Sequence, residues 1–374
     1  MRVLHIINTL EAGGAQTVLL QLLQASDKSD QHLVISLRNG NSLDAALMAA
    51  GAQVRRAGTN PLDLLRVAKE YQPDVIQSWL YHSDLLASFV AVVLRCPLVW
   101  GVHHTTLGVG SVKPTTMAVV RVLSLLSRVL PARIICCSES ALRSHIALGY
   151  PADKCVLIEN GIDVAGQVFD PAARASVCIE FGIRQNAAII GMFARYNPQK
   201  DHHGFLKAAR ILVEALAGVG RSAAFLLAGP GVDETNRELL SWINEQGVQA
   251  QVRLLGSRAD VPRLISAVDV LTLSSAYGEA LPMVLCEGMA QGALCVATDV
   301  GDTSKLLGEA GWVVPPSDPP ALAKGWMQAL QTTPAQRKTL GQQARDQVEN
   351  HYSSAAMSQK YAEVYKSVCA KHTA

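Results

Sequence analysis

The sequence predicts an α/β protein of two similar-sized domains, each a mostly parallel β-sheet covered by helices on both faces. Three observations support this fold class. The chain has 374 residues, more than one domain usually needs. Short apolar runs of strand length alternate with longer stretches of helical periodicity. A polar, irregular stretch at 164–187 interrupts this alternation, which then starts again, so we place the domain boundary there.

The composition narrows the class of protein. Hydrophobic residues make up 49% and charged residues 17% of the chain, which predicts a globular protein without long disordered tails. The net charge of +2 argues against a nucleic-acid partner. The eight cysteines form no C-x-x-C pair and lie mostly in apolar runs, as expected of reduced thiols in a cytoplasmic protein. We see no signal peptide and no apolar run long enough to cross a membrane.

The alternation sets the order of the expected elements. In the first half we expect strands at 2–8, 32–37, 52–55, 74–79, 97–103, 132–138 and 155–158, with helices at 15–23, 43–50, 61–71, 82–94, 114–130 and 140–147. In the second half we expect strands at 188–194, 223–228, 252–255, 268–273 and 293–297, and helices at 172–181, 202–216, 233–246, 283–290, 318–330, 334–350 and 353–370. Ligands of such sheets bind beyond the carboxyl ends of the strands, so we expect a ligand site in the loops that follow the strands.

The stretch from Ser274 to Gly292 joins an apolar strand to a short helix. Pro282 stands where the first helical residue is expected, because its missing N–H is not needed there. The N–H groups of Met283 and Val284 then lack partners inside the helix. Such a helix start can bind an anion through free donors and the helix dipole.

Two carboxylates lie on either side of this turn. Glu279 precedes it and Glu287 follows it in the helix. Taken alone, they are better explained as a solvated loop residue and a helix-surface residue, because short motifs often occur by chance. Together they frame an anion site with hydroxyl acceptors on both sides, which suits a nucleoside diphosphate sugar.

Other loops that follow strands carry polar or small residues. Arg195 and Lys200 lie five residues apart after strand 188–194, and two such cations can hold a diphosphate together. Gly229 lies in a tight loop after strand 223–228, and Ser257 and Arg258 follow strand 252–255. Each signal is weak alone, but several loops at one edge of a sheet make a more specific pattern.

The first half offers two further candidates. Gly13 and Gly14 follow the first strand and precede a helix, a layout that lets backbone N–H groups approach a phosphate. His103 and His104 close strand 97–103. A histidine in that position is either a hydrogen-bonded structural residue or part of a ligand site.

The segment 113–133 is basic and apolar. No acidic residue occurs between Asp84 and Glu139, whereas five basic residues do: Arg95, Lys113, Arg121, Arg128 and Arg133. A helix of this kind can lie on an anionic membrane surface. It can equally be a core helix whose arginines mark its solvated face.

Taken together, these sequence features resemble those of the retaining glycosyltransferases of the GT-B fold, family 4. The similar stretches are GGA at 13–15, VH at 102–103, IENGID at 158–163, FARYNPQKDH at 193–202, LAGPG at 227–231, LGSRADVPRLISAVDVLTLSS at 255–275, EALPMVLCEGMAQG at 279–292 and VATDVGD at 296–302. Glu279 and Glu287 reproduce the E-x7-E pair of that family.

The resemblance implies a domain organisation. Residues 1–165 would form a Rossmann-like acceptor domain, and 166–350 a Rossmann-like domain for the nucleotide sugar. The helix in 351–374 would pack back on the first domain. A central cleft would separate the two domains.

The resemblance also implies roles for the second-half residues. Arg195 and Lys200 would bind the diphosphate and stabilise it as a leaving group. Glu279 would hold the sugar ring, and Glu287 would accept hydrogen bonds from the ribose. The turn that contacts the sugar or the distal phosphate comprises Leu281, Pro282, Met283 and Val284.

The remaining implied roles concern both halves. Gly13 and Gly14 would close over the phosphates, and His103 or His104 would lie near the reacting sugar. Ser257 and Arg258 would lie near the base, and Gly229 in the donor site. One departure is at Gly301-Asp302, where many members of the family have Gly-Gly followed by a glutamate in the next helix.

The family implies a reaction without a metal or cofactor, in which the nucleotide sugar is a co-substrate. Retention at the anomeric carbon without a well-placed carboxylate nucleophile leads us to a front-face attack, with the departing phosphate accepting the proton of the acceptor hydroxyl. A saccharide or lipid-linked acceptor is expected, in cell-envelope polysaccharide or glycolipid synthesis, with the protein in the cytoplasm or on the inner face of the membrane.

Two other functions fit the same architecture. One is a non-catalytic GT-B-like subunit that binds a partner or a lipid. Such a subunit would be expected to lack Glu287, Arg195 or Lys200, and all three are present. The other is a sugar-nucleotide epimerase, whose histidine and acid pattern is not evident.

Overall fold

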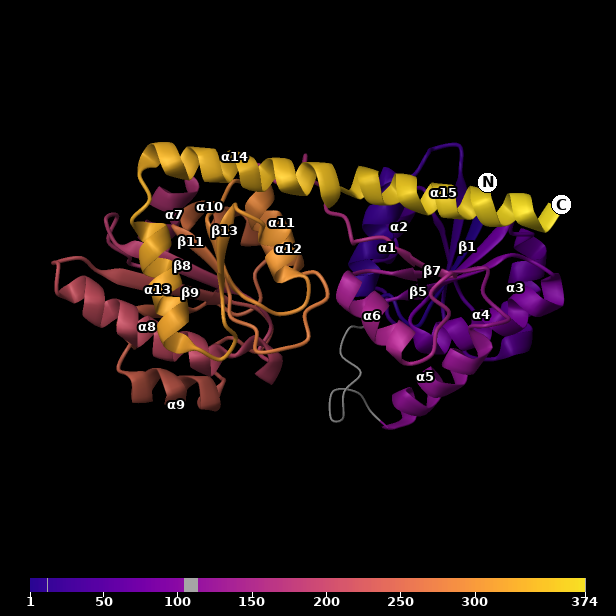
Figure 1. Ribbon diagram of the computed structural model, residues 1–374, viewed down its shortest axis with the longest axis horizontal. Helices are drawn as coiled ribbons and strands as arrows, with labels where there is room; N and C mark the ends of the chain where they lie inside the picture. Colours follow the sequence, from indigo (N-terminus) through magenta and orange to yellow (C-terminus); the bar gives the residue numbers. More distant parts are fainter. Residues whose placement is uncertain (12, 104–113, 374) are drawn as a thin grey trace. The chain divides into compact units, whose positions relative to one another are not determined.

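The computed structural model describes residues 1–11, 13–103 and 114–373, which form two compact units (Figure 1). Unit 1 contains Met1–Asp163 and Tyr352–Ala374, and unit 2 contains Val164–His351. The expected boundaries were 165/166 and 350/351. Both units are parallel-sheet, Rossmann-like α/β structures, so the predicted fold class is confirmed for each.

Unit 1 is built on a seven-stranded parallel sheet of order β3-β2-β1-β4-β5-β6-β7. Its strands are β1 (Arg2–Ile7), β2 (Gln31–Ser36), β3 (Gln53–Arg56), β4 (Val75–Trp79), β5 (Leu98–Val102), β6 (Arg133–Cys136) and β7 (Cys155–Leu157). Its helices are α1 (Gly14–Ala25), α2 (Asp44–Ala49), α3 (Pro61–Tyr71), α4 (Tyr81–Leu94), α5 (Pro114–Leu126), α6 (Glu139–Ala147) and α15 (Ser354–Thr373).

The last helix, α15, belongs to the hydrophobic core of unit 1. It contacts α1 and β4, and its tyrosines are buried because the apolar side of the helix covers the sheet. The hydroxyl of Tyr365 donates to Oε1 of Gln77 at 3.2 Å. The N–H of Ile162 donates to the carbonyl of Tyr352 at 2.9 Å, just before the helix begins. Residues nearly 300 positions apart therefore complete one core.

Unit 2 is built on a six-stranded parallel sheet of order β10-β9-β8-β11-β12-β13. Its strands are β8 (Ala188–Phe193), β9 (Ala223–Ala228), β10 (Val252–Leu254), β11 (Val270–Leu273), β12 (Cys295–Thr298) and β13 (Gly311–Val314). Its helices are α7 (Ala173–Glu180), the 3₁₀ helix η1 (Pro198–Lys200), α8 (His202–Ala217), α9 (Arg237–Gln246), α10 (Val261–Ala267), α11 (Met283–Ala290), α12 (Thr303–Leu307), α13 (Pro319–Leu330) and α14 (Pro334–His351).

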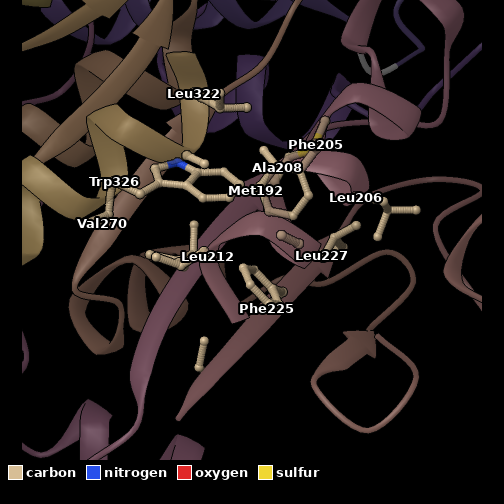
Figure 2. Packing of buried hydrophobic residues seen from close by; sticks show 14 of the residues in the cluster. Met192, Phe205, Leu206, Ala208, Leu212, Phe225, Leu227, Val270, Leu322 and Trp326 are labelled. Atoms are coloured by element: carbon tan, nitrogen blue, oxygen red, sulfur yellow. The ribbon is translucent and has the colours of Figure 1, made fainter. Parts of the chain in front are cut away.

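Aromatic rings fill the core of unit 2 (Figure 2). Phe205 of α8 meets Phe225 of β9 and Trp326 of α13 edge to face, with ring centroids 5.9 and 5.0 Å apart. The indole N–H of Trp326 donates to Oγ1 of Thr272 at 2.9 Å, so this buried polar group is satisfied. This packing holds α13 against β11, which pairs with β8 in the sheet, and these two strands position the candidate site.

Each sheet has a point where the strand order reverses. In unit 2 the chain runs from β8 outward to β9 and β10, then returns to β11 on the other side of β8. In unit 1 the corresponding neighbours are β1 and β4. The connections leave such a pair in opposite directions, which opens a crevice beyond the carboxyl ends of the two strands. The loops after β8 and β11 are therefore where a ligand of unit 2 is expected.

The basic segment 113–133 contains α5 and the start of β6. Val120 and Leu123 are buried, whereas Arg121 and Arg128 are exposed. Lys113, like His104, lies outside the described residues. Within the described part of the chain, no helix has both the length and the apolar character needed to cross a membrane.

Candidate active site

The loops after β8 and β11 bring together residues far apart in the sequence. Lys200 ends the short η1 helix after β8, and Glu279 lies in the loop between β11 and α11. Their side chains form an ion pair between Nζ and Oε1. This is the junction at which the strand order of unit 2 reverses, as the predicted strand-end pattern required.

The Lys200–Glu279 pair is largely buried. The two side chains are 16% and 8% exposed. Ser275 Oγ donates to the same Glu279 oxygen, Oε1, at 2.5 Å. A buried ion pair is tolerated because each charge compensates the other and further hydrogen bonds satisfy the remaining polar atoms. Within the described residues, Oε2 of Glu279 and two of the three N–H donors of Lys200 have no protein partner, so both groups can still bind a ligand.

Hydrogen bonds to backbone carbonyls tie these two loops together. The N–H of Ala276 donates to the carbonyl of Gln199 at 2.8 Å, and Ser274 Oγ donates to the carbonyl of Lys200 at 2.8 Å. The side chain of Gln199 donates to the carbonyl of Gly278 at 2.9 Å. The position of the ion pair is therefore set by backbone contacts rather than by the two charges alone.

A glycine from a third loop packs against Glu279. Gly301, after β12, has a φ of 60°, a conformation that favours glycine. A Cβ there would fall on the carbonyl oxygen of Glu279. Gly301 thus fixes the backbone that carries the carboxylate.

The loop after β9 lies against the start of the Arg195 loop. A Cβ on Gly229 would fall on the carbonyl oxygen of Ala194, and the φ of Gly229 is positive at 151°. The N–H of Gly229 donates to the carbonyl of Gly256 at 2.8 Å. The N–H of Tyr196 donates to the carbonyl of Pro230 at 2.8 Å. Successive strand-end loops of unit 2 are thereby joined along one edge of the sheet.

The start of α11 lies in the same loop as Glu279. The sequence predicted Pro282 as the first helical residue, but the helix begins at Met283 and Pro282 is its N-cap. The carbonyl of Pro282 accepts from the N–H of Leu285 at 3.0 Å. Within the described residues, the N–H groups of Met283 and Val284 have no acceptor, while the side chain of Leu281 is buried. The turn therefore presents two free donors at the positive end of a helix dipole.

Glu287 lies one turn further along α11. Burial raises the pKa of its carboxyl group to about 7. No hydrogen bond or ion pair to another described residue stabilises the charged form. A carboxylate held in this way is available to hydroxyl donors of a ligand.

The remaining candidates of unit 2 differ in their surroundings. Arg195 is exposed and its guanidinium has no partner among the described residues, and Ser257 is also exposed. Arg258 is committed to other side chains: its Nε lies 2.7 Å from Asp260 and its Nη2 lies 3.0 Å from Glu180. The arginines beside it lower the pKa of Asp260. The predicted contacts of these residues with a ligand stay predictions.

In unit 1, Gly13 and Gly14 begin α1 after the first strand. Gly13 is the N-cap and Gly14 the first helical residue, and both are exposed. No side chain caps this helix start. A Cβ on Gly13 would lie 2.7 Å from Oε1 of Gln16, whose amide donates to the carbonyl of Thr9 at 3.2 Å.

His103 follows β5 and stacks on the indole ring of Trp79, with ring centroids 5.1 Å apart. The indole N–H of Trp79 donates to Nδ1 of His5 at 3.3 Å. His5 then carries its proton on Nε2, which lies 3.1 Å from Nδ1 of His32. Burial lowers the pKa of His5 well below its usual value and also lowers that of His32. A neutral, directed hydrogen-bond chain therefore supports the ring on which His103 lies.

Sequence reasoning assigned no individual role to several residues that position the site: Ser275, Gln199, Gly301 and Trp79. All of them lie in or beside loops that follow strands, which was the available signal. Their roles depend on which strands are neighbours, and the alternation pattern does not reveal this.

A cavity of about 570 Å³ in unit 2 lies elsewhere. Its lining includes Val268 and Asp269, before β11, and Ala293, before β12. These positions are at the amino ends of the strands, whereas the Lys200–Glu279 pair is at the carboxyl ends. The cavity is therefore not part of the candidate active site.

Two family models match this chain. The Glycosyltransferase Family 4 model matches residues 12–165, and the Glycosyl transferases group 1 model matches residues 187–332. The chain belongs to the GT-B family 4 glycosyltransferases. Both matched ranges contain the strand-end loops described above, and glycosyl transfer is the activity of this protein.

Curated relatives agree with this assignment. EpsF of Bacillus subtilis (strain 168), described as a glycosyltransferase, is 29% identical over 80% of this chain and 79% of its own length. The D-inositol 3-phosphate glycosyltransferase of Mycolicibacterium vanbaalenii is 26% identical over 87% of this chain and 80% of its own length. The UDP-Gal:α-D-GlcNAc-diphosphoundecaprenol α-1,3-galactosyltransferase of Escherichia coli is 22% identical over 66% of this chain and 63% of its own length.

Solved structures share the fold. Anabaena Alr3699/HepE in complex with UDP superposes with a TM-score of 0.87 at 22% identity, over 98% of this chain and all of that one. The same protein with UDP-glucose gives a TM-score of 0.84. At these identities the similarity shows the fold.

Proposed function

We propose that this glycosyltransferase moves a sugar from a nucleoside diphosphate donor to a saccharide or lipid-linked acceptor, in the synthesis of a cell-envelope polysaccharide or glycolipid. The observation that carries the proposal is the buried Lys200–Glu279 pair beside the open start of α11, where the strand order of unit 2 reverses. Two findings support it: a structural neighbour binds UDP-glucose, and a relative is named for a diphosphoundecaprenol-linked acceptor.

The proposed diphosphate contacts are cationic or backbone donors. Lys200 retains two N–H donors beyond its bond to Glu279, and the guanidinium of Arg195 is exposed. The N–H groups of Met283 and Val284 add the positive end of the helix dipole. Donors fixed in advance stabilise the charge that develops on the departing diphosphate, which is the largest contribution to the rate in many enzymes.

The proposed sugar and ribose contacts are the two carboxylates. Oε2 of Glu279 can accept from sugar hydroxyls, because Lys200 and Ser275 both bind Oε1. Glu287, one turn further along α11, would accept from the ribose hydroxyls. The resemblance to the family assigns His103 to the sugar, Gly13 and Gly14 to the phosphates, and Ser257 and Arg258 to the base; these roles stay predictions.

We propose that the transfer retains the configuration at the anomeric carbon and needs no metal. The bond from the anomeric carbon to the phosphate oxygen breaks, and its electron pair stays on the phosphate. The acceptor oxygen forms the new bond on the same face, and its proton passes to the departing phosphate. The protein supplies positioning and charge stabilisation rather than a nucleophile.

The test of this proposal is the release of nucleoside diphosphate from a sugar donor in the presence of an acceptor. A thermal-shift screen with UDP, GDP and ADP sugars identifies the donor first, because a bound donor raises the melting temperature. Glu279→Gln keeps an acceptor for Ser275 and Lys200, and we expect it to lower turnover by about 10²–10³ while UDP binding persists.

Glu309→Gln, on the surface of the same unit, is the control and should be as active as the original protein. Unchanged turnover in Glu279→Gln would refute the role of Glu279. A chain that binds the donor but never releases nucleoside diphosphate with any acceptor would point to the non-catalytic alternative. Interconversion of the sugar nucleotide would point to the epimerase.

A further inference from the structure

The cavity of about 570 Å³ in unit 2 is bordered by three helical elements. They are the end of α10, the turn after α11, and α14, which packs on α11. Phe169 and Pro171, in the segment before α7, complete the lining. All of these residues belong to unit 2. We call this space the α14 cavity, and its volume is within the range of pockets that bind small molecules.

The face of α14 that lines the cavity is cationic. Arg337 and Lys338 lie one turn before Gly341, and Arg345 lies one turn after it. Arg337 and Arg345 are each about 6 Å along the helix axis from Gly341, which is within the length of an arginine side chain. A Cβ on Gly341 would meet the carbonyl oxygen of Gly292 at 2.7 Å, so α14 approaches the turn after α11 closely. A single ligand that lies over Gly341 can therefore reach both cationic ends.

These three cations keep N–H donors for a ligand. Nη1 of Arg337 donates to the carbonyl of Asp269 at 3.1 Å, and Nη1 of Arg345 donates to the carbonyl of Ala290 at 2.5 Å. These bonds hold the two guanidinium groups in place, and each group has further N–H donors. The ammonium of Lys338 forms no hydrogen bond or ion pair with another described residue.

The carboxylate in the lining does not cancel this charge. Among the described residues that line the cavity, Asp269 carries the only carboxylate, and its Oδ2 lies 3.0 Å from Nη1 of Arg174. The other N–H donors of Arg174 bind backbone carbonyls at residues 185, 187 and 267. Arg174 and Asp269 therefore neutralise each other, and the charge of the three α14 cations remains.

The other carboxylates of the bordering elements lie outside the lining. They are Asp170, Glu180, Asp260, Glu287, Asp346 and Glu349. Glu180 and Asp260 form ion pairs with arginines. Asp170 accepts from the N–H of Ala172 at 2.8 Å, and Asp346 accepts from Nε2 of Gln342 at 2.7 Å. Glu287 is in α11, and Glu349 is one turn beyond Arg345 without an ion pair to it.

The rest of the lining is apolar, with a polar group at one point. Ile265 is buried, and the ring of Phe169 is 54% exposed. Gln291 is 7% exposed, and its Oε1 accepts from Oγ of Ser266 at 2.7 Å. The amide nitrogen of Gln291 donates to one acceptor at 3.3 Å, so one of its two N–H donors remains for a ligand.

We propose that the α14 cavity binds a small organic phosphate. The phosphate group would lie on the cations of α14, because its two negative charges and its oxygens match guanidinium and ammonium donors. A carboxylate has one charge and would leave more of these cations uncompensated. The carbon part would pack on Phe169 and Ile265. Because the cavity is at the amino ends of the strands, this ligand and the sugar donor would be bound at the same time.

The test titrates phenyl phosphate into the full chain by calorimetry, with benzoate and inorganic phosphate as comparison ligands. The nucleoside diphosphate identified by the thermal-shift screen is present at saturation, so that the proposed donor site is occupied. Benzoate has the ring but one charge, and inorganic phosphate lacks the ring. We expect each to bind about tenfold more weakly than phenyl phosphate. If the screen identifies no nucleotide, the same titration is done without one.

Variants of the lining locate the bound phosphate. Lys338→Gln breaks no contact with a described residue, so the fold should be intact, and we expect it to weaken phenyl phosphate binding about tenfold. Lys338→Gln with Arg345→Gln should weaken it about 100-fold. Phe169→Ser should weaken the binding of phenyl phosphate but not that of inorganic phosphate.

The matched control removes two exposed cations of unit 2 that do not line the cavity. Lys207→Gln with Lys324→Gln should bind phenyl phosphate like the original protein. All of these variants change residues outside the proposed donor site, so their thermal stabilisation by the nucleoside diphosphate should be unchanged.

Four outcomes would overturn the proposal. The first is no binding of phenyl phosphate. The second is benzoate or inorganic phosphate that binds as tightly as phenyl phosphate. The third is Lys338→Gln that binds as tightly as the control variant. The fourth is displacement of phenyl phosphate by the nucleoside diphosphate, which would place it in the donor site. Binding of phenyl phosphate in a chain that binds no nucleoside diphosphate would support the α14 cavity and count against the proposed donor site.

Discussion

The two units share a topology and differ in what stands at the point where their strand order reverses. In unit 2 the junction of β8 and β11 holds the charged pair Lys200–Glu279, tied by backbone hydrogen bonds. In unit 1, β1 and β4 carry a neutral cluster in which the indole of Trp79 binds His5 and lies under His103. The same reversal of strand order therefore carries a charged pair in unit 2 and neutral rings in unit 1.

The outer surfaces differ as well. The exposed faces of α4 and α5 in unit 1 are apolar and basic, whereas the exposed face of α9 in unit 2 carries Arg237, Glu238 and Glu245. A parallel sheet needs only the inner face of each covering helix to be apolar. An apolar outer face is thus not required by the fold.

The largest effect is expected at the ion pair. Lys200→Met leaves the carboxylate of Glu279 buried without its counter-ion, so we expect a loss of about 3–5 kcal/mol in the free energy of unfolding. Turnover should fall by about 10²–10³, because the variant also lacks the ammonium group that is proposed to bind the diphosphate. Denaturant unfolding and product release measure the two effects.

The matched change in unit 1 is Lys360→Met, which removes the more exposed pair of Lys360 with Glu159 at 3.2 Å. This change should lower the free energy of unfolding by less than about 1 kcal/mol. The double variant Lys200→Met with Glu279→Gln should regain stability but not turnover. Equal costs for Lys200→Met and Lys360→Met would contradict the difference between the two units.

The next effect concerns the backbone under Glu279. Gly301→Ala adds a Cβ that collides with the carbonyl of Glu279 at a positive φ, so we expect it to lower both stability and turnover. Gly247→Ala, also in unit 2, has a φ of 68° and meets no atom within 4 Å. Gly247→Ala should lower the free energy of unfolding by about 1 kcal/mol, the cost of placing alanine at a positive φ, and should leave turnover unchanged. Thermal unfolding compares them, and equal melting temperatures would show that the close approach at Gly301 is unimportant.

A smaller effect concerns the pH dependence of the stability of unit 1. The pKa values of His5 and His32 are lowered in the folded state, so the unfolded chain binds more protons below about pH 6.5. Stability from these groups is present above pH 6.5 and is lost as the pH falls. We expect the free energy of unfolding to be lower at pH 5.5 than at pH 7.5, with the larger contribution from His5, whose pKa is lowered further. Hydrogen exchange in β1 and β2 reports it, and protection there that is the same at pH 7.5 and 5.5 would contradict it.

The smallest effect concerns Glu287, whose pKa is raised to about 7 by burial. A folded pKa above the unfolded value means that ionisation opposes folding as the pH rises from about 4.5 through 7. Ribose hydroxyls bind the ionised carboxylate better, so UDP affinity should rise several-fold between about pH 6 and 8 and then level off. Calorimetry at several pH values measures this. The same rise in Glu287→Gln would assign it to another group.

Much of the fold could be predicted from the sequence. Strand 223–228 and helix 61–71 have the predicted bounds, because each combines a clear period with distinct flanking residues. The short elements α10, α12 and β13 were not predicted. Pro282 was placed one residue inside its helix because Pro is compatible with both positions.

The candidate site could be predicted only in part. Lys200, Glu279 and the start of α11 were found from their positions after apolar strands. The ion pair of Arg258 with Glu180 could not be predicted from the loop that carries Arg258, because Glu180 lies 78 residues away. The stacking of His103 on the indole ring of Trp79 could not be predicted either, because Trp79 belongs to another strand.

The sequence by itself determined the alternation of strands and helices, the loops that carry charge, and the free donors at the start of α11. These are local properties, set by side-chain periodicity and by the missing partners of a helix end. Only the tertiary structure decided that β11 lies beside β8, which brings Glu279 to Lys200 across 79 residues, and that α4 and α5 keep apolar faces in solvent. Both depend on how distant segments pack, and no local pattern encodes that.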